Sequence, residues 1–470
     1  MAISRRTFGL EFEMLASLGQ IMEDADLHQT IAEHASDYFA TTIGPFDPLY
    51  EDYKCYEAPR EDWIIVSDAS LLVTTRDFRY SKERMEKPRM KALLWKFFFS
   101  GAEVVSAILD EECWNTVALL LDSLQAEPCS VIHNSSTSTH VHVGIHVPGT
   151  QSLSPLDVND DCTRVAAIWY IFETFINLLH PEHRVNEYCK RSRRSPLAKQ
   201  CDQGEFVQKL QDSKTPRNIH QIMNNTEVVR RRGRETIVTS RYFGASFENV
   251  QSDKKFTIEF RSHEGTNDFG AIECWGKLLM RLFDQAVESD WEYIWSLVDL
   301  TDGLEDQKCY GPEKTRPVTE WRRWVQHMHY LFVNFLAGQE MRNKYLNDDD
   351  PGSLEAAILE LEELVDLDDD SVDVEQRAKR EEELLIKRLA IYMTNRRAKF
   401  KNLHEGRFSN FVRWDSEGRR DPQIDDFMDY PNPTGIVRDG VGRDIPINEF
   451  RPQPEEVDAV RAAPRRRPAR

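Results

Sequence analysis

The sequence predicts a globular protein that combines a β-sheet with several long helices, and three observations support this. Three short stretches, far apart in the chain, alternate apolar and polar residues in the manner of half-buried strands. Two long stretches carry apolar residues at helical spacing. Finally, 40% of the 470 residues are hydrophobic and 10% are aromatic, a composition typical of chains that bury a core.

Residues 8–14 form the first alternating stretch, with apolar side chains at every second position and Glu at positions 11 and 13. Successive side chains of an extended strand point to opposite faces. Glu11 and Glu13 are therefore expected on one face of a strand whose other face is buried. A helix is predicted next, over 20–42, from apolar residues near helical spacing.

Two short strands are predicted after this helix. The first covers residues 63–66 and leads to Asp68, which could bind a metal ion or a nucleotide hydroxyl; taken alone, an ordinary Asp turn is the simpler explanation. The second covers 102–106 and carries Glu103 among apolar neighbours. Glu103 either faces solvent or adds a further carboxylate to a site. A helix is expected over 111–126.

The second alternating stretch has His140, His142 and His146 on one face and aliphatic residues on the other. A long amphipathic helix is predicted over 155–180, and its Asp-rich start suits the positive end of the helix dipole. A basic run at 190–194 follows. This run could steer an anionic substrate, although a solvated surface is the commoner explanation.

A polar stretch ending near Arg234 contains consecutive arginines at 230–232, and it is predicted to be an exposed loop or a nuclear address. The third alternating stretch then places Glu259, Arg261 and His263 on one face. A strand over 241–250 is predicted to pair with it.

The polar faces of the three alternating stretches hold Glu, His and Arg with little neutral filler. If the three strands pair in one sheet, these faces would line a surface rich in metal ligands. Carboxylates and imidazole suit a divalent cation, and an adjacent Arg suits phosphate. Three unrelated half-exposed strands are the alternative; the combination of residue types favours a site.

Three regions are predicted along the chain. A helix over 268–288 and Trp-rich helices to about residue 339 complete a catalytic domain of residues 1–345. Acidic tracts then introduce a linker and a charged helix over 346–403. The last region, 404–470, is expected to be largely disordered because Pro, Gly and Asp are scattered through it.

The net charge of −20 argues against general nucleic-acid binding. The N-terminal residues do not resemble a signal peptide, and no apolar run reaches the roughly 18 residues that a membrane span needs. The eight cysteines are scattered without a CxxC pair, so no zinc knuckle or disulfide framework is indicated. We therefore expect a soluble intracellular protein without a membrane partner, cytoplasmic or nuclear.

With these residues placed, the sequence resembles the amidoligase family, which is grouped with glutamine synthetase and glutamate–cysteine ligase among the carboxylate–amine ligases. The segments that carry the resemblance occur in the family's order: 7–13, 68–70, 103–106, 140–144 and 257–266. Three departures concern neighbours of the predicted ligands. Ala69 stands where Gly is common, Ser138-Thr139 where Cys-Gly is common, and Ala107 where Pro is common.

The resemblance implies an α+β fold in which a curved antiparallel sheet forms a funnel, with helices packed on its outer face. It also implies that ATP and Mg²⁺ or Mn²⁺ bind on the concave side. The γ-phosphoryl group would activate a carboxylate as an acyl phosphate, and an amine would then attack to form an amide or isopeptide bond. The partners would be a small-molecule or peptide carboxylate and an amine.

The family's site residues can be carried over position by position. By similarity, the metal ligands would be Glu11, Glu13, Glu103, His140 and Glu259. His142 and Asp68 would lie against the nucleotide, and Arg261 would stabilise the transferring phosphoryl group. Arg261, Glu259 and Glu11 would thus be the catalytic residues, with Arg184 and Tyr188 near the substrate.

Two other classes of function remain open. A zinc or manganese hydrolase can use a His-x-His pair with carboxylates, where a metal-bound water attacks an amide or ester. Such sites seldom need Glu-rich strands beside a phosphate-suited Arg. A catalytically inactive ligase fold that serves as a scaffold is the third possibility. Binding of ATP with a divalent ion separates the ligase from both.

Overall fold

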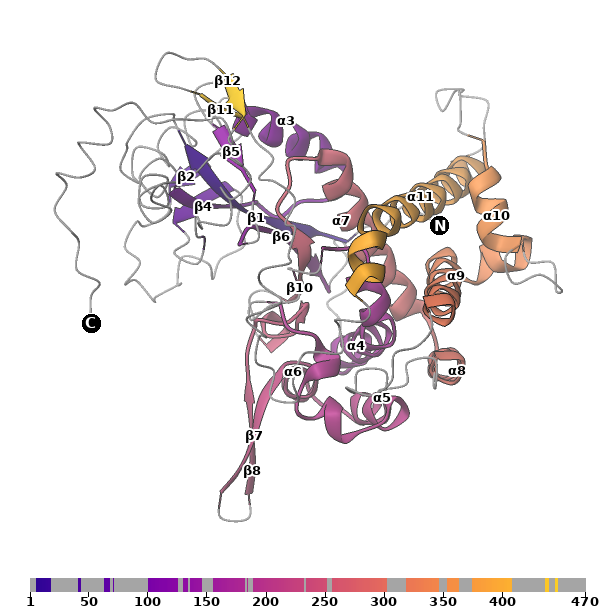
Figure 1. Ribbon diagram of the computed structural model, residues 1–470. Helices are drawn as coiled ribbons and strands as arrows, with labels where there is room; N and C mark the ends of the chain where they lie inside the picture. The colour runs from indigo at the N-terminus through magenta and orange to yellow at the C-terminus, as the bar shows by residue number, and fades with distance from the viewer. Residues whose placement is uncertain are drawn as a thin grey trace. The chain divides into compact units, whose positions relative to one another are not determined.

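The computed structural model describes residues 6–17, 41–43, 63–67, 71, 100–125, 130–133, 136–145, 155–181, 184, 189–231, 234–251, 256–301, 318–345, 353–362, 374–407, 436–438 and 444–446. The chain divides into two compact units. Figure 1 labels helices and strands that they contain. We call the two units the sheet unit, comprising Gly9–His140, Glu264–Phe269 and Met428–Arg470, and the helical unit, comprising Met1–Phe8, Val141–His263 and Gly270–Phe427.

The sheet unit holds an open, largely antiparallel sheet with the strand order β2-β3-β4-β1-β6, and β5 pairs with β1. The bounds are β1 Phe8–Ser17, β2 Thr41–Ile43, β3 Trp63–Ser67, β4 Ser100–Val105, β5 Ser130–Ile132 and β6 Ser138–Gly144. Only the pairing of β2 with β3 is parallel among the registers described. The predicted strands at 8–14, 63–66 and 102–106 are thus confirmed.

A 3-10 turn, Glu111–Cys113, and helix α3, Trp114–Gln125, confirm the helix predicted over 111–126. Asp110 caps this start by accepting a hydrogen bond from the Glu112 N–H at 3.1 Å. Near the end of the chain, β11 (Ile436–Arg438) pairs antiparallel with β12 (Asp444–Pro446). These two strands lie inside the predicted tail, whose other residues beyond Arg407 fall outside the described part of the chain.

The helix predicted over 20–42 is wrong at its end, because Thr41–Ile43 forms strand β2. Consecutive β-branched residues fit a pleated strand better than a helix. Residues 20–40 of that prediction lie outside the described residues.

In the helical unit, the end of β6 continues into the order β6-β10-β9. Strands β9 (Ala245–Ser246) and β10 (Thr257–Glu264) are antiparallel, which confirms the predicted pairing but shortens the first strand. The helices are α4 Pro155–Asn177, α5 Gln203–Gln211, α6 Pro216–Met223, α7 Phe269–Glu288, α8 Trp291–Thr301, α9 Val318–Tyr345, α10 Ser353–Glu360 and α11 Val374–Arg407. Predicted helices over 155–180 and 268–288 are confirmed.

Helix α4 lies at the centre of the helical unit and contacts α5, α6, α8 and α9. Nearly every residue of its second half is buried, the polar Glu173 and Asn177 included, so the predicted amphipathic character does not extend to this half. Phe172 and Phe175 both pack against Phe332 of α9, with ring centroids 4.8 and 5.6 Å apart. The C-terminal helices join this core, since Arg396 of α11 donates a hydrogen bond to the Leu179 carbonyl at 2.8 Å.

The polar stretch before Arg234 is not a loop. It holds α5 and α6 and most of a hairpin formed by β7 (Asn225–Arg231) and β8 (Arg234–Thr239). Helix α5 begins with a capping box between Asp202 and Glu205, and α6 begins after the N-cap Thr215. Within the described part of the chain, no helix has the length and apolar composition to cross a membrane.

Candidate functional site

In the sheet unit, strands β1, β4 and β6 bring three glutamates around one histidine, and we call Glu11, Glu13, Glu103 and His140 the cation cluster. The Nδ1 atom of His140 lies 2.9 Å from a carboxylate oxygen of Glu11, and its Nε2 atom lies 3.5 Å from one of Glu13. Glu103 is directly opposite Glu13 in the β1–β4 register. Four of the five predicted metal ligands are therefore neighbours.

These side chains do not form a solvated face. Glu13 is 7% exposed and His140 is 1% exposed, while Glu11 and Glu103 are half-buried. Carboxylates withdrawn from water need compensating charge or hydrogen bonds, and like charges at opposed strand positions destabilise a sheet. The burial thus rules out the interpretation of this strand face as ordinary solvent-facing sheet.

Ser138 also belongs to this group, although its residue type gave no signal in the sequence. Its hydroxyl donates a short hydrogen bond to Glu13 and lies 2.8 Å from Nε2 of His140. Both ring nitrogens of His140 consequently contact oxygen atoms from fixed strands. A hydrogen bond at one ring nitrogen orients a histidine so that its other nitrogen can serve as a ligand, and the Ser138 contact at Nε2 is suited to that role.

The donor set fits a divalent cation. One candidate ligand atom from each of Glu11, Glu103 and His140 lies within 4.8 Å of the other two. Two or three carboxylate oxygens with one imidazole nitrogen suit Mg²⁺ or Mn²⁺. A cation placed there would also offset the repulsion between the opposed carboxylates of Glu13 and Glu103.

In the helical unit, Glu259 and Arg261 point to the same face of β10 and form a close ion pair, which we call the Arg261 pair. Both residues are buried, at 5% and 7% exposure. The guanidinium of Arg261 lies 5.6 Å from the ring centroid of Tyr242. Arg184, also buried, donates a hydrogen bond of 2.9 Å to the backbone carbonyl of Arg261. The predicted catalytic and substrate residues Glu259, Arg261 and Arg184 are therefore brought together.

Two histidines of the alternating stretches have different surroundings. His142 is half-buried, and its Nδ1 lies 3.4 Å from the Thr257 hydroxyl. His263 is fully buried and packs its ring against those of His180 and Trp275, at centroid distances of 5.2 and 5.9 Å. The role of His142 against a nucleotide stays a prediction, whereas His263 contributes to packing.

Glu173 of α4 is a buried carboxylate that the sequence pattern did not indicate. It is 1% exposed and accepts hydrogen bonds from the backbone N–H groups of Ser192 at 2.7 Å and Arg193 at 2.9 Å. Burial raises the pKa of Glu173, and these two hydrogen bonds oppose the rise. Glu173 thus holds the basic run at 190–194 in a 3-10 turn, and Arg191 of that run is buried instead of solvated.

A family model described as "putative amidoligase enzyme" matches residues 4–283, which is more than half of the chain. The chain belongs to this amidoligase family. The matched region contains the cation cluster, the Arg261 pair and Arg184. The match ends at residue 283, within α7, and helices α8 to α11 follow it.

Among solved structures, the chain is similar to the crystal structure of a bifunctional glutathione synthetase from Pasteurella multocida, with 11% identity and a TM-score of 0.32. The alignment covers 84% of this chain and 52% of that chain, so the chain spans about half the length of that protein. No curated protein matches the chain.

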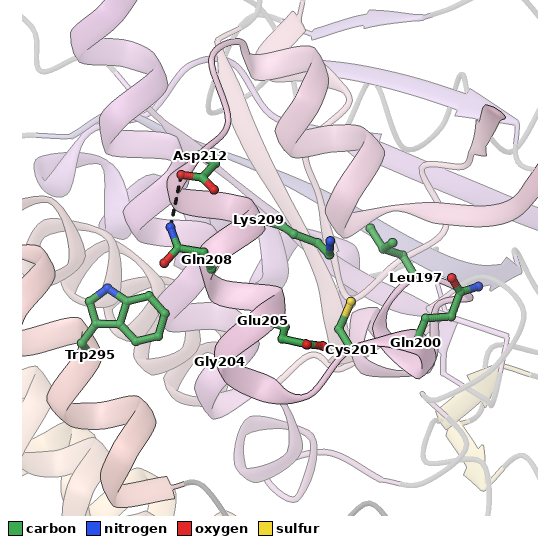
Figure 2. A pocket seen from close by; sticks show the side chains of 9 residues that line it. All are labelled: Leu197, Gln200, Cys201, Gly204, Glu205, Gln208, Lys209, Asp212 and Trp295. Carbon is green, nitrogen blue, oxygen red and sulfur yellow. Dashed lines mark hydrogen bonds between the residues drawn. The ribbon is translucent and has the colours of Figure 1, made fainter. Parts of the chain in front are cut away.

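Asp68 and Tyr188, which were predicted to bind nucleotide and substrate, lie outside the described residues, as does His146. The helical unit also has a pocket of about 670 Å³ between α5 and Trp295 of α8 (Figure 2). Its lining residues are Leu197, Gln200, Cys201, Gly204, Glu205, Gln208, Lys209, Asp212 and Trp295. None of the predicted site residues lines this pocket.

Proposed function

We propose that this amidoligase is an ATP-dependent carboxylate–amine ligase that forms an amide or isopeptide bond through an acyl phosphate. The observation that carries the proposal is the buried cation cluster, in which three carboxylates converge on one imidazole in a chain of this family. The proposal includes a curved sheet of the glutamine synthetase type with nucleotide and cation on its concave side. Its substrates are a small-molecule or peptide carboxylate and an amine, within the cell.

The cation cluster would hold Mg²⁺ or Mn²⁺, and Glu259 stays a metal ligand predicted from the family resemblance. A bound cation supplies charge neutralisation to a triphosphate and to the developing negative charge of the reaction. The protein's contribution is to fix the donor atoms before the ion arrives. Ser138 does this for Glu13 and His140, and the β1–β4 register does it for Glu103.

Arg261 would stabilise the phosphoryl group during transfer to the substrate carboxylate. Its guanidinium offers a rigid fork of N–H donors that matches phosphoryl oxygens, and its contact with Glu259 fixes the orientation of that fork. Arg184 supports the same strand through the Arg261 carbonyl and, with Tyr188, would lie near the substrate. His142 and Asp68 would complete the nucleotide contacts.

The experiment measures ADP release by the full-length protein with ATP and Mg²⁺ or Mn²⁺, against pools of amino acids, peptides and polyamines. The ligase requires ADP formation that depends on both a carboxylate and an amine, with an amide product detected by mass spectrometry. Amide or ester cleavage that needs the metal but no ATP would instead establish a hydrolase. Absence of both nucleotide binding and turnover would leave the scaffold function.

A further inference from the structure

Helix α11 lies outside the residues that the family model matches, because the match ends at residue 283 and α11 covers Val374–Arg407. The helix is nevertheless part of the core of the helical unit. Its residues Ile386, Leu389 and Met393 are at most 1% exposed. A helix packed this closely transmits its position to the residues of the matched region that it touches.

Arg396 connects α11 with the matched region. It is 6% exposed, and its Nε donates a hydrogen bond of 2.8 Å to the Leu179 carbonyl. The rings of Tyr392 and Phe400, one helical turn to either side, have their centroids 5.9 and 4.8 Å from its guanidinium. These two rings hold the guanidinium in place, so the hydrogen bond has a fixed direction.

The carbonyl that Arg396 binds belongs to the turn that follows α4. We call Leu178, Leu179, His180, Pro181 and Arg184 the α4 exit. The first three donate their N–H groups to carbonyls three residues earlier, at 2.9, 3.0 and 3.4 Å, and the Arg184 N–H donates to the Pro181 carbonyl at 2.9 Å. Leu179 is fully buried, so its carbonyl would cost free energy without a donor. A positively charged donor also suits the end of a helix.

The α4 exit contacts strand β10 at two points. A guanidinium nitrogen of Arg184 donates a hydrogen bond of 2.9 Å to the Arg261 carbonyl. The His180 ring lies edge-on to the His263 ring, with the centroids 5.2 Å apart. Since Arg261 and His263 are two residues apart, they share one face of β10. A chain of contacts within the helical unit thus runs from Arg396 through the α4 exit to Arg261.

We propose that Arg396 is a positioning residue for Arg261, so that α11 belongs to the functional part of the ligase although the family model ends before it. The role of Arg261 in phosphoryl transfer rests on the proposed function, whereas the coupling of Arg396 to β10 does not. A displacement of about 1 Å at a group that contacts the transition state lowers turnover strongly. Loosening the α4 exit should therefore reduce kcat and leave ground-state binding of ATP nearly unchanged.

Two variants of Arg396 separate its hydrogen bond from its charge. The side-chain nitrogen of Gln is as many bonds from the backbone as Nε of Arg, so Arg396→Gln keeps a donor for the Leu179 carbonyl. Arg396→Met has a similar length and no donor. In ADP formation by the full-length protein, Arg396→Met should lower kcat about tenfold with the KM for ATP within about twofold of wild type. Arg396→Gln should keep kcat within about threefold. Equal losses in the two variants would overturn the proposal.

Nuclear magnetic resonance of histidine ring protons tests the coupling without ATP or substrate. The signals of His263 and His220 are assigned by their loss in His263→Gln and His220→Gln. His220 is a buried histidine of α6 outside the chain of contacts, and its Nδ1 lies 3.1 Å from the side-chain oxygen of Asn224. Asn224 in turn donates a hydrogen bond of 2.7 Å to the Ala245 carbonyl.

Arg396→Met should shift or broaden the His263 signals, because the neighbouring His180 ring moves with the α4 exit, and it should leave the His220 signals in place. Arg396→Gln should leave both in place. An unchanged His263 signal in Arg396→Met, or equal shifts of the His263 and His220 signals, would overturn the proposal.

Ile386→Ala is the control for a loss of stability, because it removes buried apolar contacts of α11 about 15 Å along the helix from Arg396. It should lower the melting temperature and keep kcat within about twofold. A loss of kcat as large as that in Arg396→Met would reduce Arg396 to a general contribution to stability and overturn the proposal. Arg388→Met, at an exposed position of α11, should behave as wild type does.

If Arg396→Met does not fold, Phe400→Leu is the second variant. It removes the ring nearer to the guanidinium and keeps the donor. The His263 signals should then shift in the same direction by a smaller amount, and an unchanged His263 signal would overturn the proposal.

The positioning role and the ligase function fail separately. Equal ADP formation by wild type and Arg396→Met would remove the positioning role while the ligase function stands. Absence of ADP formation by wild type with every carboxylate and amine, together with the expected shift of the His263 signals, would remove the ligase function while the coupling of α11 to β10 stands.

Discussion

The cation cluster and the Arg261 pair are built from the same kind of strand but have opposite chemistry. In the sheet unit, three carboxylates surround one imidazole, so the buried group is rich in acceptors. In the helical unit, Arg261 contacts Glu259 and is supported by Arg184, so the buried group is rich in donors. The strand pattern determines where a side chain points, and the neighbouring strands determine whether the site suits a cation or an anion.

The largest expected effect comes from removing a charge of the cation cluster. Glu13→Gln should lower metal-dependent ADP formation by about 100-fold or more and weaken Mn²⁺ binding by calorimetry, because the neutral amide is a poor ligand beside Glu103. Glu112→Gln, which changes an exposed glutamate, is the control. Unchanged Mn²⁺ affinity in the Glu13 variant would show that the cluster does not hold the ion.

A variant of the Arg261 pair is expected to lower turnover without weakening Mn²⁺ binding. Arg261→Lys keeps the positive charge but loses the bidentate fork, so turnover at saturating ATP should fall about 100-fold while Mn²⁺ affinity changes little. Glu259→Gln is a better partner variant than Glu259→Ala, because the amide oxygen of Gln can still accept a hydrogen bond from Arg261. A parallel loss of Mn²⁺ affinity in Arg261→Lys would erase the distinction between the two regions.

Acid should act on the helical unit through His329, a buried residue of α9. Burial and the nearby Arg397 lower the pKa of His329 to about 3, whereas an unfolded His titrates near 6.5. The unfolded chain therefore takes up this proton first as the pH falls, and folding stability declines below about pH 6.5. The loss at pH 5 is about 2 kcal/mol.

Urea unfolding at pH 7 and pH 5 measures this loss, and His329→Gln should be less sensitive to pH by the same amount. The control is His327→Gln, which changes another histidine of the same helix. Identical pH dependence in wild type and His329→Gln would assign acid sensitivity to other groups.

The smallest effect is expected at Gly265 in the sheet unit. An added Cβ would lie 2.4 Å from the Thr137 hydroxyl oxygen and 2.6 Å from Nδ1 of His133, and the Gly265 N–H donates to the Thr137 carbonyl. Gly265→Ala should therefore cost about 1 to 2 kcal/mol and shift the start of β6, where Ser138 lies. Mn²⁺ binding should weaken a few fold, and an unshifted melting temperature would contradict this packing argument.

The sequence predicted the strands of the cation cluster and the Arg261 pair because their alternation is strict and their polar residues are distinctive. It did not predict β7 and β8, because Val228 and Val229 are adjacent and interrupt the alternation. The starts of α5 and α6 carry capping residues, Asp202 with Glu205 and Thr215, which are typical of helix starts. The polar composition of this stretch nevertheless favoured the prediction of a loop. Ser138 and Glu173 could not be found, because their roles depend on partners from other elements.

Asn224 makes two backbone segments depend on a single side chain. The amide protons of Ser240 and Phe247 are both bound by Asn224, one through its backbone and one through its side chain. Neither proton can exchange with deuterium until Asn224 moves away from its partner. The two amides should therefore exchange at similar rates and respond together to any change at this residue, so that isotope exchange reports the opening of the hairpin base as one event.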